Sequence, residues 1–172
     1  MIYGAKTLHR RYTLKNPEKY MEKVAPPICK SSWEERIFLA MDVNPFITKW
    51  AYEPFSIYYR SPKFNKMSIY KPDIYCECNY ANGEKQRYLI EIKPQKFSVM
   101  PKEPPPLKQD ATAKQKRSYM KKIMRYQMQL QEVMVNQAKW SAAKEWCVNN
   151  HMNWLVLTEE NMRGLFSTNA RI

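Results

Sequence analysis

The 172-residue sequence predicts an α/β fold in which a mixed central β-sheet is flanked by α-helices. Two observations carry this prediction. Strand-like segments lie on both sides of Asn82-Gly83, a strong hairpin signal, and helical patterns separate this hairpin from one more short apolar strand near the end of the chain. An order of helix, antiparallel strands, helices and a last strand is typical of a layered domain, and the length suits a single one.

The first elements are a basic segment and a helix. Residues 1–30 are predicted to form a basic amino-terminal arm, rich in lysine, arginine and tyrosine, that ends at Pro26-Pro27. Ser31 or Ser32 then caps a helix over residues 33–41, because a serine hydroxyl accepts hydrogen bonds from the first free backbone N–H groups. Residues 31–172 are predicted to form the single folded domain.

The sheet follows the helix. Aromatic and β-branched residues predict strands over residues 47–52, 55–60, 73–80 and 87–93, with a loop over residues 61–66. In the strand over residues 87–93, Ile90 and Ile92 lie on one face, whereas Glu91 and Lys93 lie together on the other, because side chains alternate along a strand.

The last third of the chain is predicted to be mostly helical. Five prolines between residues 94 and 106 predict an exposed loop over residues 94–109. A helix over residues 111–135 follows, and Asn136 is predicted to cap a shorter second helix. A strand over residues 154–157 and a final helical turn from Thr158 to Gly164 complete the chain. Four methionines of the helical region are expected to face the core: Met120, Met124, Met128 and Met134.

The charge balance indicates a polyanionic partner. Lys and Arg outnumber Asp and Glu by 29 to 16, which gives a formal net charge of +13. An excess of this size on one small domain is typical of proteins that bind nucleic acid. The helix over residues 111–135 carries much of this charge and is the candidate DNA-binding surface, with a merely solvated helix face as the alternative. Its candidate DNA-binding residues are Lys114, Lys116, Arg117, Lys121 and Lys122.

Scarce residue types exclude several kinds of active site. The chain has two distant histidines, His9 and His151, which argues against zinc hydrolases and a Ser-His-Asp triad. Its three glycines exclude a Walker-type phosphate loop. Any catalysis therefore depends on carboxylates and lysine. The scattered cysteines and the lack of a long apolar stretch or secretory signal predict an intracellular protein with reduced cysteines and no membrane contact.

Asp73, Glu91 and Lys93 are the candidate catalytic residues. Two carboxylates and an amine at one sheet edge suit Mg²⁺, which needs only one or two carboxylates beside a substrate phosphate, and they suit metal-assisted hydrolysis of a phosphodiester. Glu34 or Glu35 in the predicted helix is placed to complete the metal shell. Each signal is weak alone, because Glu-x-Lys pairs also occur as strand ion pairs and acids favour helix amino termini anyway.

In this order, the motifs resemble the PD-(D/E)xK nuclease superfamily. The residues that carry the resemblance are Glu34, Pro72-Asp73 and Ile90-Glu91-Ile92-Lys93-Pro94. Five further segments resemble the head-completion nucleases of T4-like tailed bacteriophages, a family similar to the end-cleaving endonuclease subunit of certain cut-and-paste transposons. These segments are Asn16-Pro17-Glu18-Lys19-Tyr20, Ser31-Ser32-Trp33-Glu34, Trp50-Ala51-Tyr52-Glu53-Pro54, Asn136-Gln137-Ala138-Lys139-Trp140 and Leu157-Thr158-Glu159.

The resemblance implies a restriction-endonuclease-like core and a Mg²⁺-dependent DNA endonuclease, with Mn²⁺ able to substitute. It implies that Glu34, Asp73 and Glu91 bind the metal and act in catalysis together with Lys93, and Glu35 is the alternative helix acid. The implied substrate is double-stranded DNA that protrudes from a packaged phage head before tail attachment. The implied partners are head and portal proteins, and the implied location is the cytoplasm of the infected bacterium or the virion head.

Two other functions remain open from the sequence. The first is a non-catalytic virion protein that binds the DNA end at the head portal, which explains the net charge equally well but leaves Asp73, Glu91 and Lys93 unexplained. The second is an RNA-binding module, for which the sequence shows no aromatic RNA-binding signature.

Overall fold

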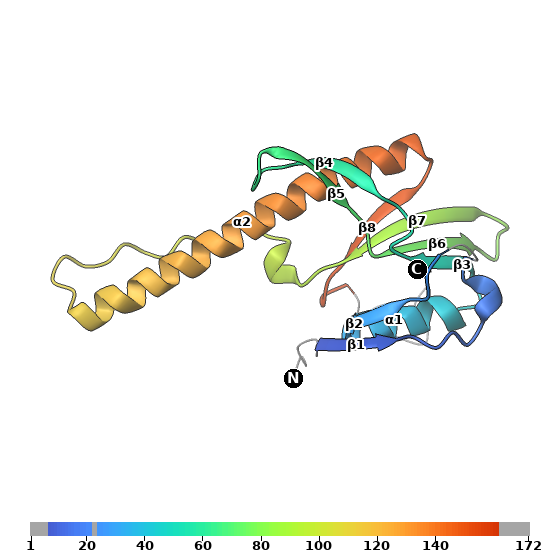
Figure 1. The fold of residues 1–172 in the computed structure, drawn as a ribbon, viewed down its shortest axis with the longest axis horizontal. Coiled ribbons are helices and arrows are strands. Elements are labelled where there is room, and N and C mark those ends of the chain that lie inside the picture. Colours follow the sequence, from blue (N-terminus) through green and yellow to red (C-terminus); the bar gives the residue numbers. More distant parts are fainter. Residues whose placement is uncertain (1–6, 22–23, 162–172) are drawn as a thin grey trace.

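The computed structural model describes residues 7–21 and 24–161 and has a four-stranded mixed sheet at its centre (Figure 1). In spatial order the strands are β3 (Ile47–Tyr52), β6 (Ile74–Asn79), β7 (Lys85–Ile92) and β8 (Asn153–Leu157). The first three strands pair antiparallel, and β8 runs parallel to β7. The predicted hairpin is confirmed: Gly83, between β6 and β7, has φ +83°, which glycine adopts at no steric cost.

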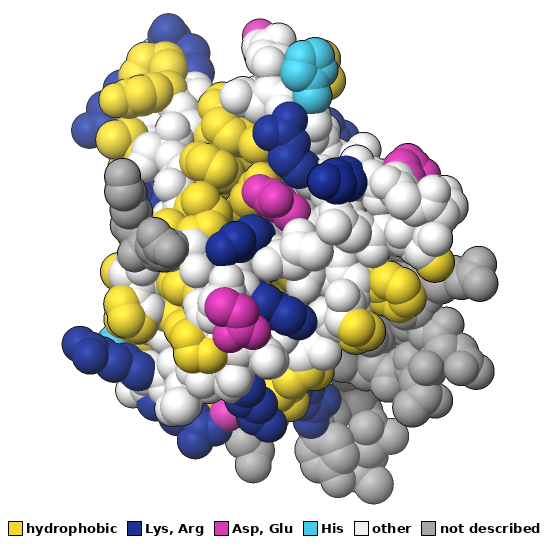
Figure 2. Space-filling view, turned by 90° about the vertical axis from the view of Figure 1, so that its right-hand side faces the viewer, with side chains coloured by type: hydrophobic (Ala, Val, Ile, Leu, Met, Phe, Trp, Pro, Cys, Tyr) yellow, Lys and Arg dark blue, Asp and Glu magenta, His cyan; other side chains and the backbone are white. Residues whose placement is uncertain are grey.

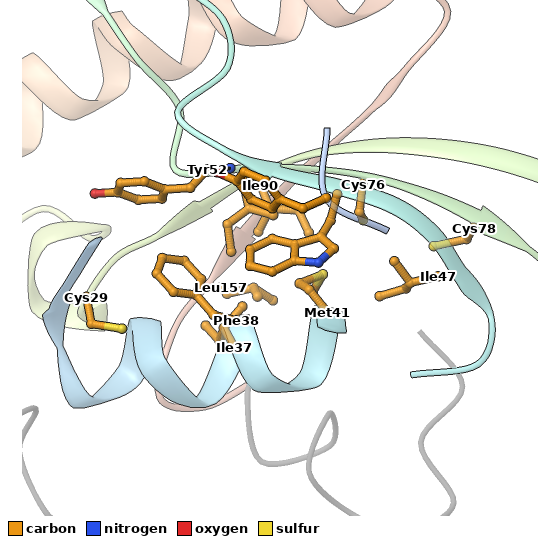
Figure 3. Packing of buried hydrophobic residues seen from close by; sticks show 13 residues of the cluster. Cys29, Ile37, Phe38, Met41, Ile47, Tyr52, Cys76, Cys78, Ile90 and Leu157 are labelled. Carbon is orange, nitrogen blue, oxygen red and sulfur yellow. Dashed lines mark hydrogen bonds between the residues drawn. The ribbon is translucent and has the colours of Figure 1, made fainter. Parts of the chain in front are cut away.

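The two long helices cover opposite faces of this sheet, which confirms the predicted α/β layering. On one face, α1 (Ser32–Val43) packs Ile37 and Phe38 into a core that includes Ile90 (Figure 3). On the other face, the carboxyl-terminal half of α2 (Ala113–Asn149) packs against Leu89. Neighbouring residues of β7 thus enter different cores, as the alternation of side chains along a strand requires.

A reciprocal cap fixes the start of α1. The Ser31 hydroxyl accepts a hydrogen bond from the Glu34 backbone N–H at 3.1 Å, and the Glu34 carboxylate accepts one from the Ser31 N–H at 3.1 Å. Of the two serines predicted as caps, the structure selects Ser31. Such a capping box satisfies two otherwise unpaired N–H groups, and here it also holds the Glu34 carboxylate at the amino end of the helix.

The segment predicted as an amino-terminal arm is packed onto the domain wherever it is described. It forms β1 (Thr7–Arg11), the short 3-10 helix η1 (Pro17–Lys19) and β2 (Ile28–Ser31), and β1 pairs antiparallel with β2. Tyr20 and Cys29 are buried in the same core as Phe38. Lys6 and Lys23, two of the basic residues in this segment, lie outside the described residues.

The loop predicted over residues 61–66 is instead the turn of a second hairpin. Its strands are β4 (Ile57–Ser61) and β5 (Lys66–Tyr70), and they pair antiparallel. The signal for β5 is weak in the sequence because its outward-facing residues, Met67 and Ile69, are hydrophobic although more than half exposed. Polar and apolar residues do alternate from Lys66 to Ile69, but the apolar residues lie on the exposed face, which is the reverse of a half-buried strand.

The prediction of two helices after residue 110 is wrong, because α2 is one continuous helix of 37 residues. Asn136 is not a cap but a buried residue inside this helix, and its side-chain amide donates a hydrogen bond to the Phe97 carbonyl at 3.1 Å. That contact holds η2 (Gln95–Phe97), a short 3-10 helix within the predicted proline-rich loop, against α2. Asparagine is also a common helix cap, so the sequence alone does not distinguish a cap from a buried amide whose partner lies far away in the chain.

The methionines expected in the core are exposed. Met120, Met124 and Met128 are between 63% and 67% exposed, and Met134 is 47% exposed. The amino-terminal half of α2 extends well beyond the sheet, so it has no core to face (Figure 1). Helical spacing of apolar residues shows that they share a side of a helix, not that this side is covered.

The end of the described chain shows the predicted cap at Thr158. The Thr158 hydroxyl accepts a hydrogen bond from the Glu160 N–H, whereas Gly164 lies outside the described residues. None of the helices in the described ranges combines the length and hydrophobicity needed to cross a membrane.

Candidate active site

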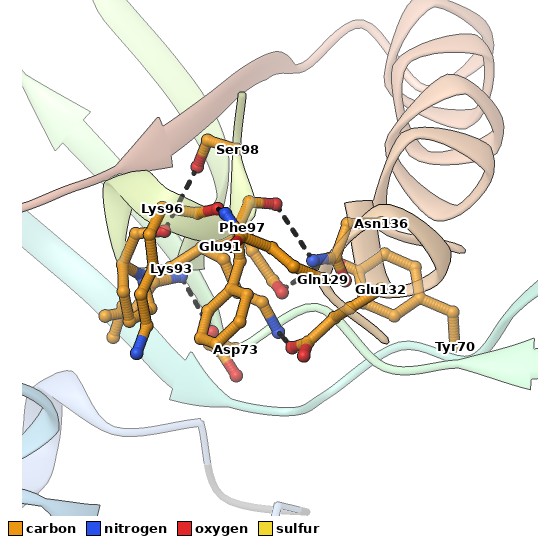
Figure 4. Close-up of polar contacts among 12 residues, drawn as sticks. Tyr70, Asp73, Glu91, Lys93, Lys96, Phe97, Ser98, Gln129, Glu132 and Asn136 are labelled. Carbon is orange, nitrogen blue, oxygen red and sulfur yellow. Dashed lines mark hydrogen bonds and ion pairs between the residues drawn. The ribbon is translucent and has the colours of Figure 1, made fainter. Parts of the chain in front are cut away.

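The pairing of β6 with β7 brings two of the predicted acids together. Ile74 lies opposite Ile90, so Asp73, just before β6, and Glu91, near the end of β7, meet at the same edge of the sheet. The backbone N–H of Ile92 donates a hydrogen bond to the Asp73 carboxylate at 2.7 Å (Figure 4). Backbone geometry therefore positions Asp73 directly beside the strand that carries Glu91 and Lys93.

Glu91 is held by a tyrosine that sequence reasoning missed. The Tyr70 hydroxyl donates a hydrogen bond to Glu91 Oε2 at 2.5 Å, and both side chains are buried, at 5% and 6% exposure. Tyr70 reaches the site because it ends β5, three residues before Asp73. The sequence offers one signal for Tyr70, namely that it lies three residues before Asp73. That signal indicates a site residue only once the second hairpin is known.

Lys93 follows β7 directly and points toward α2. Its backbone N–H donates to the Leu157 carbonyl at 2.8 Å, which anchors it to β8. Its ammonium lies 3.6 Å from the Glu132 carboxylate and 5.9 Å from the centroid of the Phe97 ring (Figure 4). The side chain is 22% exposed, so its charge is partly shielded from solvent.

A second lysine, Lys139 of α2, joins the site and was also missed. Its ammonium lies 5.4 Å from the centroid of the Tyr70 ring. Burial lowers its pKa, and the nearby Lys93 lowers it further, whereas Glu91 opposes this shift. Lys139 belongs to one of the segments on which the family resemblance rests. Only the packing of α2, 46 residues further along the chain than Lys93, brings it to the sheet edge.

The two central carboxyl groups share a crowded environment. Burial raises the pKa of Asp73 well above its usual range, and the neighbouring Glu91 raises it further. Burial also raises the pKa of Glu91, although the Tyr70 hydroxyl and Lys93 oppose that shift. Both acids therefore resist ionisation in the free protein, and a cation placed between them would favour their charged forms.

Glu34 and Glu35 point to different partners. Glu34, held by the capping box, lies close enough to Asp73 to contribute to the raised pKa of that carboxyl group. Glu35 instead forms an ion pair with Arg10 of β1. The structure thus places Glu34, and not Glu35, on the side of the candidate site.

A further acid, Glu53, lies next to Asp73 and was not predicted as a site residue. Its backbone N–H donates to the Asp73 carbonyl at 2.9 Å, and its carboxylate lies 2.7 Å from the Lys30 ammonium. Its φ of +46° is left-handed, a conformation that costs a residue other than glycine roughly 1–2 kcal/mol. This backbone conformation ends β3 and accompanies an acid that adds negative charge near Asp73.

The available oxygen donors fit a magnesium ion. Within the described ranges, no three His, Cys, Asp or Glu side chains are grouped as a ready-made metal cage. Mg²⁺ does not require one, because it commonly binds through one or two carboxylates and completes its shell with water and substrate phosphate. Asp73 and Glu91 supply two carboxylates at one position, with pKa values that a cation would bring down.

A basic groove runs from Lys93 along α2. It has a volume of about 570 Å³ and lies between α2, the turn of the second hairpin and η2. Five cationic side chains and one acid line it: Lys63, Lys93, Lys96, Arg125, Lys139 and Glu132. Of the five predicted DNA-binding residues, none lines this groove. They lie further toward the amino end of α2, in its projecting half.

Replacement of Asp73 by asparagine should raise the melting temperature in metal-free buffer at pH 8. Because the pKa of Asp73 is raised in the folded state, the folded protein binds a proton more tightly there than the unfolded chain does, and stability falls as the pH rises above the ordinary range of an aspartic acid. Asparagine removes this cost and still accepts from the Ile92 N–H. Each kcal/mol gained corresponds to about 2–4 °C.

The gain should shrink toward pH 4, where the aspartic acid is itself protonated, and Mg²⁺ should stabilise only the unmodified protein. Differential scanning calorimetry measures both effects, with the exposed Asp110→Asn change as the control. A melting temperature for Asp73→Asn below that of the unmodified protein at pH 8 would contradict this account.

Comparisons with known proteins give the family of the chain. Residues 44–159 match the family described as TnsA-like endonuclease N terminal, a range that begins before β3 and ends after β8. The chain is also 29% identical over 155 residues to the head completion nuclease of Enterobacteria phage T4, and the alignment covers 90% of this chain and 93% of that protein. No solved structure matched the chain. Since the family match spans more than half of its residues, the chain belongs to the TnsA-like endonuclease family.

Proposed function

We propose that this protein is a Mg²⁺-dependent DNA endonuclease of the PD-(D/E)xK type. The observation that carries the proposal is the meeting of Asp73 and Glu91 at one sheet edge, with Lys93 beside them at the mouth of a basic groove. Membership of an endonuclease family gives the reaction class, and the oxygen donors of the two acids suit Mg²⁺, with Mn²⁺ as a substitute.

In this proposal each side chain has a defined task. Asp73 and Glu91 hold the metal ion, and Glu34 contributes a third negative charge from the start of α1. A bound Mg²⁺ would supply Lewis-acid polarisation of the scissile phosphodiester. Tyr70 keeps the Glu91 carboxylate in place through its hydrogen bond. The Lys93 ammonium stabilises the negative charge that develops on the phosphate and orients the attacking water.

The biological setting is proposed from the similarity to the phage T4 protein. The T4 protein that this chain resembles along most of its length is a head completion nuclease. By this likeness the substrate is double-stranded DNA that protrudes from a packaged head, the partners are head and portal proteins, and the protein acts in the infected bacterium or at the virion head. The basic amino-terminal half of α2 is the proposed DNA-binding surface, with Lys114, Lys116, Arg117, Lys121 and Lys122 as its candidates.

Purified protein should nick or linearise supercoiled plasmid with Mg²⁺ or Mn²⁺, and EDTA should stop the reaction. Gel electrophoresis of the plasmid over time measures the rate, and readdition of excess Mg²⁺ after EDTA should restore it. DNA binding without cleavage under all metal conditions would instead favour a non-catalytic protein that binds the DNA end at the portal.

A further inference from the structure

The projecting half of α2 carries uninterrupted positive charge. No acidic residue occurs between Asp110 and Glu132, whereas this stretch holds six lysines and arginines: Lys114, Lys116, Arg117, Lys121, Lys122 and Arg125. The surface at the other end of the molecule differs, because there basic side chains stand among acidic and hydrophobic ones (Figure 2). The charge on α2 is therefore a local feature and not merely a sample of the overall excess.

Four of these cations form a single stripe. Lys114, Arg117, Lys121 and Arg125 are spaced three or four residues apart, which places them on one side of the helix. The same spacing continues through Met128 and Glu132, and Lys139 follows two helical turns later; all three line the basic groove, as Arg125 does. We call these four cations with Lys139 the basic stripe. It begins near the tip of α2 and ends beside the candidate active site, and Met128 and Glu132 lie between its last two cations, Arg125 and Lys139.

Lys116 lies off the basic stripe, and Lys122, which is three residues before Arg125, lies at its edge. Each is a direct neighbour of a stripe residue, and consecutive residues are rotated by about 100° around a helix. Both are exposed to solvent, and so are Lys114 and Lys121. The helix thus offers two pairs of lysines that match in type, exposure and helix segment and differ in their position around the helix.

The opposite wall of the groove is held in place against α2. The Gln129 side chain donates a hydrogen bond to the Lys96 carbonyl at 2.7 Å, and the Asn136 side chain donates one to the Phe97 carbonyl at 3.1 Å (Figure 4). These contacts fix η2 on the helix. Lys96 of η2 and Lys63 of the hairpin turn line the groove together with Arg125 and Lys139, so cations stand on η2, the turn and α2, as a channel for a phosphate backbone requires.

We propose that duplex DNA lies along the basic stripe for about one helical turn on one side of the scissile phosphate, with one of its strands entering the groove. The proposal rests on the proposed function and adds the path of the duplex over the protein and the length of duplex that is contacted. From Lys114 to Lys139 the helix rises about 38 Å at 1.5 Å per residue, close to the 34–36 Å of one turn of B-DNA. A straight helix of this length suits a stiff duplex better than a flexible single strand.

Binding without metal tests the stripe independently of catalysis. Affinity for a labelled duplex of about 30 base pairs is measured in EDTA by fluorescence anisotropy across a salt series. Because each lost phosphate contact lowers the slope of log K against log salt by about 0.9, Lys114→Gln/Lys121→Gln should lower it by about 1.8. Lys116→Gln/Lys122→Gln should lower it by less than half as much. The exposed Lys49→Gln/Lys85→Gln pair, on the strands β3 and β7 of the sheet and not on α2, is the control.

If the two double variants lower the salt slope equally, the proposal that DNA follows the basic stripe is wrong, because positive charge spread around the whole helix would then explain the binding. A loss confined to the first variant supports it even if the protein cleaves nothing, so the failure of the proposed function is distinguishable from the failure of this inference.

Duplex length provides the second test. In the same EDTA buffer, affinity should rise steeply with duplex length up to about one helical turn and more slowly beyond it, and the Lys114→Gln/Lys121→Gln variant should show a flatter rise. If the protein cleaves, cuts mapped on an end-labelled duplex should avoid the last ten or so base pairs at one end of each strand. Equal affinity for single-stranded DNA of the same length would overturn the assignment to duplex.

Discussion

Replacement of Lys93 by alanine should lower the rate of DNA cleavage at least about 100-fold while the protein stays folded. The Lys93 ammonium lines the basic groove, 3.6 Å from the Glu132 carboxylate, and lies close enough to Glu91 to lower the pKa of that carboxyl group. A positive charge held in place before the reaction stabilises charge that develops only in the transition state, and its removal commonly costs a factor of 100 or more. The fold should survive because Lys93 makes its strand contact through its backbone.

The matched control for this change is Lys85→Ala. Lys85 begins the same strand, is exposed, and lies at the end of β7 opposite to the site. Single-turnover cleavage of plasmid by both variants, with circular dichroism melts to confirm folding, separates chemistry from stability. If Lys93→Ala cleaves as fast as Lys85→Ala, the lysine has no part in the reaction. The nearby Lys139 would then be the next candidate.

The features that could be predicted from the sequence are those that short-range rules govern. The Asn82-Gly83 turn fixes the register of β6 and β7, and that register alone decides that Asp73 meets Glu91. The helix cap is equally local, although two pairs fit the rule of a serine and a glutamate three residues apart, Ser31 with Glu34 and Ser32 with Glu35, and the structure selects the first. Local signals therefore positioned Asp73 and Glu91 and narrowed the helix acid to Glu34 or Glu35, between which the packing of β1 against α1 decides.

The features that escaped prediction depend on contacts between distant segments. Tyr70 holds Glu91 only because a second hairpin folds back onto the sheet, and Lys139 reaches the site only because α2 packs across it. Asn136 looked like a helix cap because its partner, the Phe97 carbonyl, is 39 residues away. No pattern within a window of ten or twenty residues contains these partners, so periodicity and turn chemistry cannot reveal them.

Replacement of Trp50 by alanine should destabilise the protein by about 3–5 kcal/mol, the usual cost of removing a large aromatic side chain from a core. Trp50 is fully buried in β3 at the centre of the aromatic cluster. Its ring centroid lies 4.8 Å from that of Tyr20, 5.6 Å from that of Phe38 and 6.1 Å from that of Tyr12. Urea unfolding measures the loss, and Tyr58→Ala, an exposed aromatic change on β4, should cost about 0.5 kcal/mol or less.

Trp50→Phe gives an intermediate test of the same contact. The indole Nε1 has no hydrogen-bond partner among the described residues. Replacement by phenylalanine therefore removes side-chain volume from the core without breaking a hydrogen bond to these residues. The cost should be less than half that of alanine. An alanine variant as stable as Tyr58→Ala would show that the aromatic cluster contributes little to the fold.

The same variant decides whether the amino-terminal segment is an arm or part of the domain. Tyr12 and Tyr20 come from the segment predicted as an arm, and the Met21 N–H donates to the Trp50 carbonyl at 3.1 Å. If that segment folds with the sheet, Trp50→Ala should speed hydrogen exchange at Met21 and at the N–H of Tyr12, which donates to the Pro27 carbonyl. A separate arm would exchange rapidly already and show no change. Protection that falls together in β3 and in this segment would make them one cooperative unit, whose core lies on the opposite face of the sheet from α2.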